Sequence, residues 1–94
     1  MDTRGVSGQG EGASTRRIAV VGVIISNREK AAPRVNEVLG LHADIIVGRM
    51  GIPYRERDIA VIALIVDGTT DDIGSLTGKL GSIEGVRVRS CVAV

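Results

Sequence analysis

Few side chains in this 94-residue chain could carry out chemistry. His42 is the only histidine and Cys91 the only cysteine, and neither has a partner base or soft metal ligand near it in the sequence. A site made of these two alone would lack ligands unless a second subunit supplied them. We therefore expect His42 to be solvated or to cap a helix, and Cys91 to be a small buried residue. Asp71 and Asp72 suit the first turn of a helix better than acid–base work. From these residues we predict that the protein is not an enzyme and has neither a metal site nor a cofactor.

Glycines form a second group with chemical potential. Gly74-Ser-Leu-Thr-Gly78-Lys79 superficially suggests a phosphate loop, but its spacing is too short and it lies within a predicted helix. At 100° per residue, Gly74, Gly78 and Gly81 form a stripe away from that helix's apolar residues. Such a stripe admits close approach by a ligand or another backbone. A local explanation, with Gly81 as a C-cap and Gly74 in a loose first turn, stays open.

Arginines form a third group. Arg49, Arg55 and Arg57 flank the connection that runs from Gly51 to Tyr54, and together they could bind an anion or a nucleic-acid backbone. The formal net charge is only +1, and Tyr54 is the only aromatic residue. Stacking platforms for bases are thus absent, so we do not expect nucleic acid as the partner.

The elements that must position these residues follow from hydrophobic patterning. Short, β-branched apolar runs predict strands over 18–25, 43–50, 59–66 and 86–92. Helical spacing predicts one helix between Asn27 and Gly40, in which Pro33 forces a late start or a kink, and a second beginning near Thr70. Residues 1–16 have almost no apolar side chains to bury and predict a disordered tail before a single domain of residues 17–94.

An internal repeat orders these elements. Ile18-Ala19-Val20 recurs as Ile59-Ala60-Val61, an offset that also relates Gly40 to Gly81. Two βαβ halves in one sheet predict a ferredoxin-like α+β fold: a βαββαβ two-layer sandwich with a four-stranded antiparallel sheet and both helices on one face. The expected strand order is 4-1-3-2.

The two central strands are apolar on both of their faces, although a two-layer sandwich covers only one face of its sheet. A second sheet packed on the open face, most simply from another copy, removes the exposed apolar surface. We assign this interface to side chains of the first, third and fourth strands, namely Val21, Val23, Ile25, Ile62, Leu64, Arg87 and Arg89. The alternative is that the N-terminal tail covers the open face.

With these segments identified, the chain resembles the iron-only hydrogenase system regulator family, in the wider ACT-like group. The resemblance spans residues 17–92 and is carried by Arg28-Glu29-Lys30, Val35-Asn36-Glu37-Val38-Leu39, the run from Gly48 to Glu56, the run from Ile73 to Gly81, and Gly85-Val86-Arg87-Val88. It implies a βαββαβ fold, self-association through the sheet and a link to hydrogenase maturation. Ser26-Asn27-Arg28-Glu29 stands where amino-acid-sensing ACT domains often carry an Asp-x-Pro-Gly-like turn, which argues against an amino-acid ligand.

The sequence therefore predicts a non-enzymatic, oligomeric regulatory or ligand-sensing module, forming a dimer or tetramer through its sheet. Candidate ligand residues lie in the connections and on the second helix: Asn27, Arg49, Gly51, Tyr54, Arg55, Gly74 and Gly78. A structural adaptor for a partner protein and an anion- or nucleic-acid-binding module remain the alternatives. Arg16-Arg17 before an apolar run imitates a secretion signal, but that run is only eight residues long. We expect a cytoplasmic protein without a membrane-spanning segment.

Overall fold

The computed structural model describes residues 15–94, and the predicted tail lies outside these residues apart from its last two positions. The chain forms four strands, two α-helices and two short 3₁₀ turns. In chain order these are β2 (Arg17–Ile25), α1 (Arg28–Leu41), η3 (Ala43–Ile45), β3 (Ile46–Tyr54), η4 (Arg55–Arg57), β4 (Ile59–Gly68), α2 (Thr70–Gly81) and β5 (Val86–Val92).

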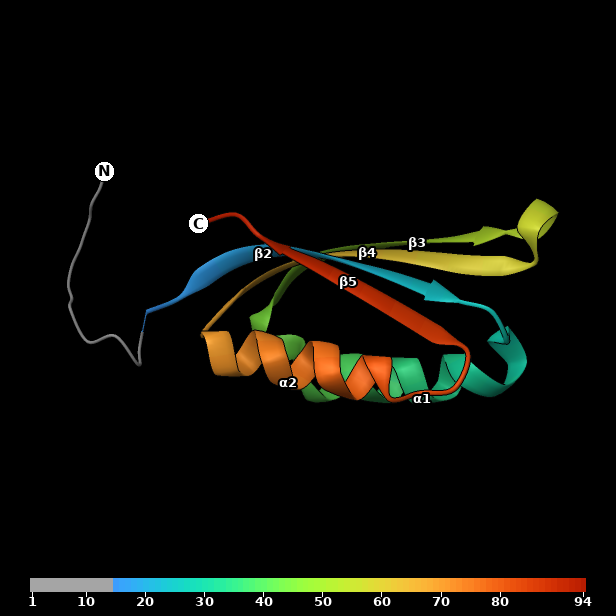
Figure 1. The fold of residues 1–94 in the computed structure, drawn as a ribbon, viewed down its shortest axis with the longest axis horizontal. Helices are drawn as coiled ribbons and strands as arrows, with labels where there is room; N and C mark the ends of the chain where they lie inside the picture. Colours follow the sequence, from blue (N-terminus) through green and yellow to red (C-terminus); the bar gives the residue numbers. More distant parts are fainter. Residues whose placement is uncertain (1–14) are drawn as a thin grey trace.

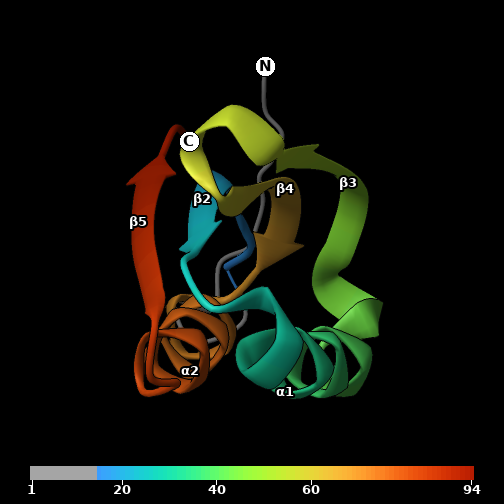
Figure 2. The same cartoon turned by 90° about the vertical axis from the view of Figure 1, so that its right-hand side faces the viewer.

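The strands form one open antiparallel sheet in the order β3-β4-β2-β5. Both helices lie against the same face of this sheet, as the side view shows (Figure 1). Seen from the end, α2 lies on the β5 side of the helix layer and α1 on the β3 side (Figure 2). The βαββαβ sandwich and the expected strand order are confirmed.

The core lies between the sheet and the helices. In β2 and β4 every second residue points into it, and the register pairs Val21 with Leu64 and Val23 with Ile62 across the two central strands. Helix α1 contributes Val35 and Leu39, among others. The core is wholly aliphatic, consisting of Ala19, Val21, Val23, Ile25, Ala31, Val35, Val38, Leu39, Ile45, Ile62, Leu64, Val66, Ile73, Leu76, Leu80 and Val86.

The two helices begin in different ways. Thr69 and Asp72 form a reciprocal capping box at α2: the Thr69 hydroxyl accepts from the Asp72 N–H, and the Asp72 carboxylate accepts from the Thr69 N–H, both at 3.1 Å. Asn27 is the N-cap residue of α1, as expected, but its side chain makes no capping hydrogen bond. Pro33 lies inside α1, which nevertheless begins at Arg28, so of the two expected effects of this proline the late start is wrong and the kink stays a prediction.

Strand β3 differs most from the sequence-based prediction. The structure has a 3₁₀ turn, Ala43–Ile45, where the sequence predicts the start of this strand. The strand then continues through Gly51, Ile52 and Pro53, where the sequence predicts a loop. Because β3 is an edge strand with a register shift between Ile46 and Gly48, it tolerates a proline that a central strand would reject.

Candidate functional site

The face of the sheet opposite the helices carries a cluster of exposed apolar side chains. Its exposed aliphatic and aromatic side chains come from the three strands β2, β3 and β4: Val20, Met50, Ile52, Tyr54 and Ile65 are each between 42% and 62% exposed. The strand register places Val20 beside Ile65, and Met50 and Ile52 beside Ala63 and Val61. We call this surface the open face. It is aliphatic, as the sequence predicted, and no element within residues 15–94 covers it.

The assignment of individual residues to that face was wrong for β2 and β4. Val21, Val23, Ile25, Ile62 and Leu64 were expected at a subunit interface, but they point toward the helices and are at most 8% exposed. The alternate set, with Val20 and Ile65, lies on the open face. Both sets are apolar, so alternation along the strands could not distinguish them.

One sequence signal could have identified the open face. Gly22 lies directly opposite Ala63 at its centre, so the two central strands meet there through the smallest side chains available. A core layer has to be filled to near-crystalline density. The side with valine and leucine at the equivalent positions, Val21 and Leu64, was therefore the better candidate for the core.

The two β5 arginines do lie on the open face, where the sequence placed them. Arg87 and Arg89 pair with Ile24 and Gly22 of β2 and are exposed. Cys91 follows on the same side, opposite Val20. It is a free, exposed thiol, so the expectation of a buried cysteine is wrong.

Two of the candidate ligand residues meet in one cavity. Asn27 and Arg55 both line a space of about 440 Å³ beside the start of α1, although 28 residues separate them in the sequence. The remaining lining residues are Ser26, Arg28, Glu29 and Asp58. Two guanidinium groups thus share the cavity with two carboxylates, which suits a small polar molecule that carries both charges.

The other candidates of the β3 region lie elsewhere. Arg49 extends along α1, where its guanidinium is 3.5 Å from the Asn36 amide oxygen. Gly51 lines a separate cleft of about 230 Å³ between β3 and α1, and Tyr54 lies on the open face. Arg49 does not line the cavity that Arg55 lines. The three arginines that the sequence grouped together therefore do not form one anion site.

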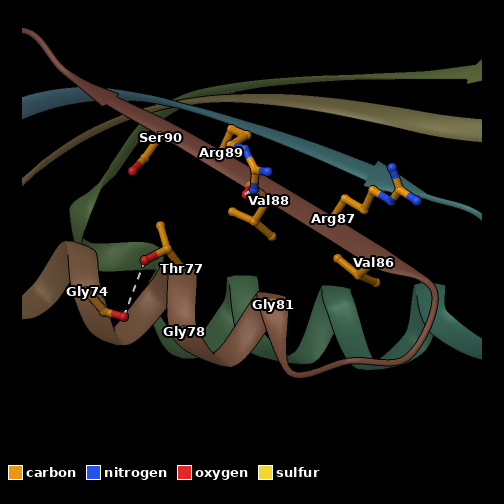
Figure 3. A pocket seen from close by; sticks show the side chains of 9 residues that line it. All are labelled: Gly74, Thr77, Gly78, Gly81, Val86, Arg87, Val88, Arg89 and Ser90. Atoms are coloured by element: carbon orange, nitrogen blue, oxygen red, sulfur yellow. Dashed lines mark hydrogen bonds between the residues drawn. The ribbon is translucent and has the colours of Figure 1, made fainter.

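Gly74 and Gly78 of α2 line a groove of about 700 Å³ against β5 (Figure 3). Gly81 continues the same line, and the opposite wall is the strand from Val86 to Ser90. A methyl group added at any of the three glycines would meet nothing within 4 Å. The predicted stripe is therefore a real surface, and packing within the domain does not require it.

Two residues with catalytic potential are engaged in structure instead. His42 is buried at the end of α1, with Nδ1 2.8 Å from the Val38 carbonyl oxygen and Nε2 3.2 Å from the Ser75 hydroxyl. It caps α1, as expected, but is not solvated. The Thr69 backbone N–H, and after it the Thr69 side chain, hydrogen-bond Asp72 and lower the pKa of its carboxyl group.

Across residues 15–94, no group of three or more His, Cys, Asp or Glu side chains could hold a metal ion. Neither of the two helices in this part of the chain is long and apolar enough to cross a bilayer.

Comparison with known proteins identifies relatives of the whole domain. No curated protein matches. Among solved structures, the uncharacterized protein TM1266 from Thermotoga maritima is 39% identical, with a TM-score of 0.81 over 84% of this chain and 99% of that one. An unknown protein from Galdieria sulphuraria, 13% identical with a TM-score of 0.57 over 84% of this chain and 46% of that one, shares the fold alone. Residues 17–90 match a family model described as TM1266-like, an iron-only hydrogenase system regulator, a role that the description marks as provisional. The chain belongs to this TM1266-like family.

Proposed function

We propose that this protein is a non-enzymatic regulatory module of the iron-only hydrogenase system, and that it works as a homo-oligomer joined through the open face. The observation that carries the proposal is the cluster of half-exposed apolar side chains on β2, β3 and β4. Monomeric proteins rarely leave such a contiguous patch in water. The family match supports the regulatory role.

The strength of the association follows from the exposure of these side chains. Burying a half-exposed Val, Ile, Met or Tyr contributes roughly 1 kcal/mol, so the five residues contribute about 5 kcal/mol per copy and about 10 kcal/mol per pair. Association itself costs roughly 4–15 kcal/mol in lost translational and rotational freedom. At the favourable end the balance is about 6 kcal/mol, which corresponds to a weak, reversible dimer with a Kd of roughly tens of micromolar. Such dimers could pair again into a tetramer.

The proposed function is non-enzymatic because the side chains that could carry out catalysis are engaged in structural contacts or lie apart from one another. Both ring nitrogens of His42 lie within hydrogen-bond distance of internal partners, and the Asp72 carboxylate is engaged in the capping box of α2. Cys91 lies on the open face, whereas His42 lies in the helix layer. A nucleophile–base pair needs direct contact. The free thiol supports a reducing, cytoplasmic setting.

Sedimentation velocity across a micromolar concentration series tests the self-association. Ile65→Lys places a charge on the open face, beside Val20, and should yield a monomer. Leu41→Lys is the matched control, because Leu41 is 68% exposed at the end of α1, away from the open face. A wild-type monomer at high micromolar concentration, or dissociation by the Leu41 variant alone, would contradict the proposal.

The sensing part of the proposal assigns the ligand to the cavity shared by Asn27 and Arg55. A thermal-shift screen with small metabolites, metal ions and nucleotides should identify a compound that raises Tm, because a ligand of the folded state stabilises it. Arg55→Ala should abolish that shift. Arg57→Ala is the control, since Arg57 belongs to the same turn but does not line the cavity. An equal loss in both variants would argue against this site.

A further inference from the structure

The free backbone edge of β5, at the rim of the open face, is a second candidate surface. Ser26 donates to the Gly85 carbonyl at 2.7 Å and Ala93 to the Ile18 carbonyl at 2.8 Å, which fixes the alternation of hydrogen bonds between β2 and β5. The backbone groups of Arg87, Arg89 and Cys91 therefore face β2. Those of Val88, Ser90 and Val92 point away from the sheet, along an edge that no other strand of residues 15–94 pairs with.

The groove between β5 and α2 leaves room beside this edge. Its helix wall is glycine at three positions, with open space around each, and Thr77 is the one α2 residue with a side chain among those that line it. On the strand wall, Val88 and Ser90 face the helix, whereas Arg87 rises on the opposite side (Figure 3). A strand paired with β5 would thus direct alternate side chains into the groove and the others toward the arginines.

The charged side chains of β5 determine which side chains a complementary strand would need. Within residues 15–94 neither Arg87 nor Arg89 forms an ion pair. Arg89 bends toward the edge and donates to the Val88 carbonyl at 3.0 Å, so its guanidinium lies at the edge and must leave this oxygen when a new strand pairs there. Carboxylates opposite these two side chains would form favourable cross-strand pairs.

A second copy of β5 fits this edge poorly. If a two-fold axis passed at Val88, Arg89 or Ser90, an arginine of one copy would lie opposite or diagonal to an arginine of the other. Like charges in these positions destabilise an antiparallel pair. The complementary occupant carries acidic residues where β5 carries basic ones.

We propose that β5 is a docking edge for an extended acidic segment of a partner protein. The segment pairs with the backbone of Val88, Ser90 and Val92 as a fifth strand. Its acidic side chains, at alternate positions, meet Arg87 and Arg89, and the aliphatic side chains between them enter the groove beside Gly74 and Gly78. This edge lies beyond the apolar side chains of β2, β3 and β4, with Arg87 and Arg89 on the rim of the open face between the two surfaces.

The first experiment uses a fluorescent peptide, Thr-Val-Glu-Val-Glu-Val-Thr, and the same peptide with Lys in place of Glu. Fluorescence anisotropy should detect binding of the glutamate peptide, and this binding should weaken with added salt. The lysine peptide should bind at least about tenfold more weakly than the glutamate peptide. Hydrogen exchange should slow at the amides of Val88, Ser90 and Val92. No binding of the glutamate peptide up to millimolar concentration, or equal binding of both, overturns the proposal.

Two variants test the geometry. Ser90→Pro removes an outward N–H but no N–H that faces β2, so it should abolish peptide binding in a folded protein. Gly78→Leu should raise Tm, because leucine favours a helix over glycine, and yet weaken the peptide about tenfold by filling the groove. Loss of binding in a more stable protein cannot come from misfolding.

Gly40→Leu is the matched control, since Gly40 lies in α1 with equally open surroundings and should leave binding unchanged. Unaltered binding in Ser90→Pro overturns the proposal. Altered self-association in that variant, with the peptide unaffected, would instead make a second copy the occupant of the edge. Sedimentation velocity reports the open-face dimer separately.

Discussion

Leu64 and Ile65 are neighbours in β4 that point to opposite faces of the sheet, so alanine at each position should have very different effects. Leu64 is 0% exposed and packs beneath the helices, whereas Ile65 is 49% exposed on the open face. Removing a fully buried leucine costs about 2–5 kcal/mol through lost burial and the cavity left behind. Removing a half-exposed isoleucine forfeits roughly 1 kcal/mol in the monomer.

These free energies translate into separable melting temperatures. About 1 kcal/mol shifts the Tm of a domain this size by roughly 4–8 °C, so Leu64→Ala should lower Tm by at least about 8 °C. Far-UV circular dichroism is the suitable probe, because the chain has no Trp and only one Tyr. Ile65→Ala should lower Tm by roughly 4–8 °C in dilute solution, where the protein is monomeric.

Concentration adds a second test of the same pair. If the open face is the dimer interface, the effect of Ile65→Ala grows with protein concentration, because the dimer stabilises the wild type by mass action. The loss in Leu64→Ala comes from the core and is present at every concentration. Equal destabilisation by both variants in dilute solution would refute the assignment of faces.

Three further changes probe single interactions. Gly85→Ala should cost roughly 1–2 kcal/mol, because the backbone there has φ of +84°, and urea denaturation measures that loss; an unchanged midpoint would argue against the left-handed conformation. His42→Ala should cost about 2 kcal/mol in the same assay, since it empties a buried site and leaves the Ser75 hydroxyl without its ring partner; a neutral result would mean that water replaces the imidazole. Asp72 has a lowered pKa in the folded protein, so its contribution is present above the pKa of the unfolded state and is lost as pH falls through the folded-state pKa. Asp72→Asn should therefore reduce stability at neutral pH and flatten its fall in acid, whereas parallel pH profiles of variant and wild type would count against this linkage.

The number, type and order of the elements follow from the sequence because they depend on local pattern. Each β-branched run forms a strand, and the repeat that relates Ile18 to Ile59 relates two strands that pair at the centre of the sheet. Thr69 and Asp72 begin α2 with contacts three residues apart, which sequence spacing can anticipate. Strand β3 was misplaced because its edge position, which makes Pro53 acceptable, is not a local property.

The candidate surfaces were also predictable from the sequence in part only. The sequence established that one face of the sheet carries exposed aliphatic side chains and that the glycines of α2 lie away from the core, since both follow from periodicity. Tertiary structure decided which residues form the open face, because Val21 and Val20 are equally apolar and only the packing of the helices distinguishes them. It also brought Asn27 to Arg55, and the glycines to the free edge of β5, across distances in the chain that no local pattern encodes.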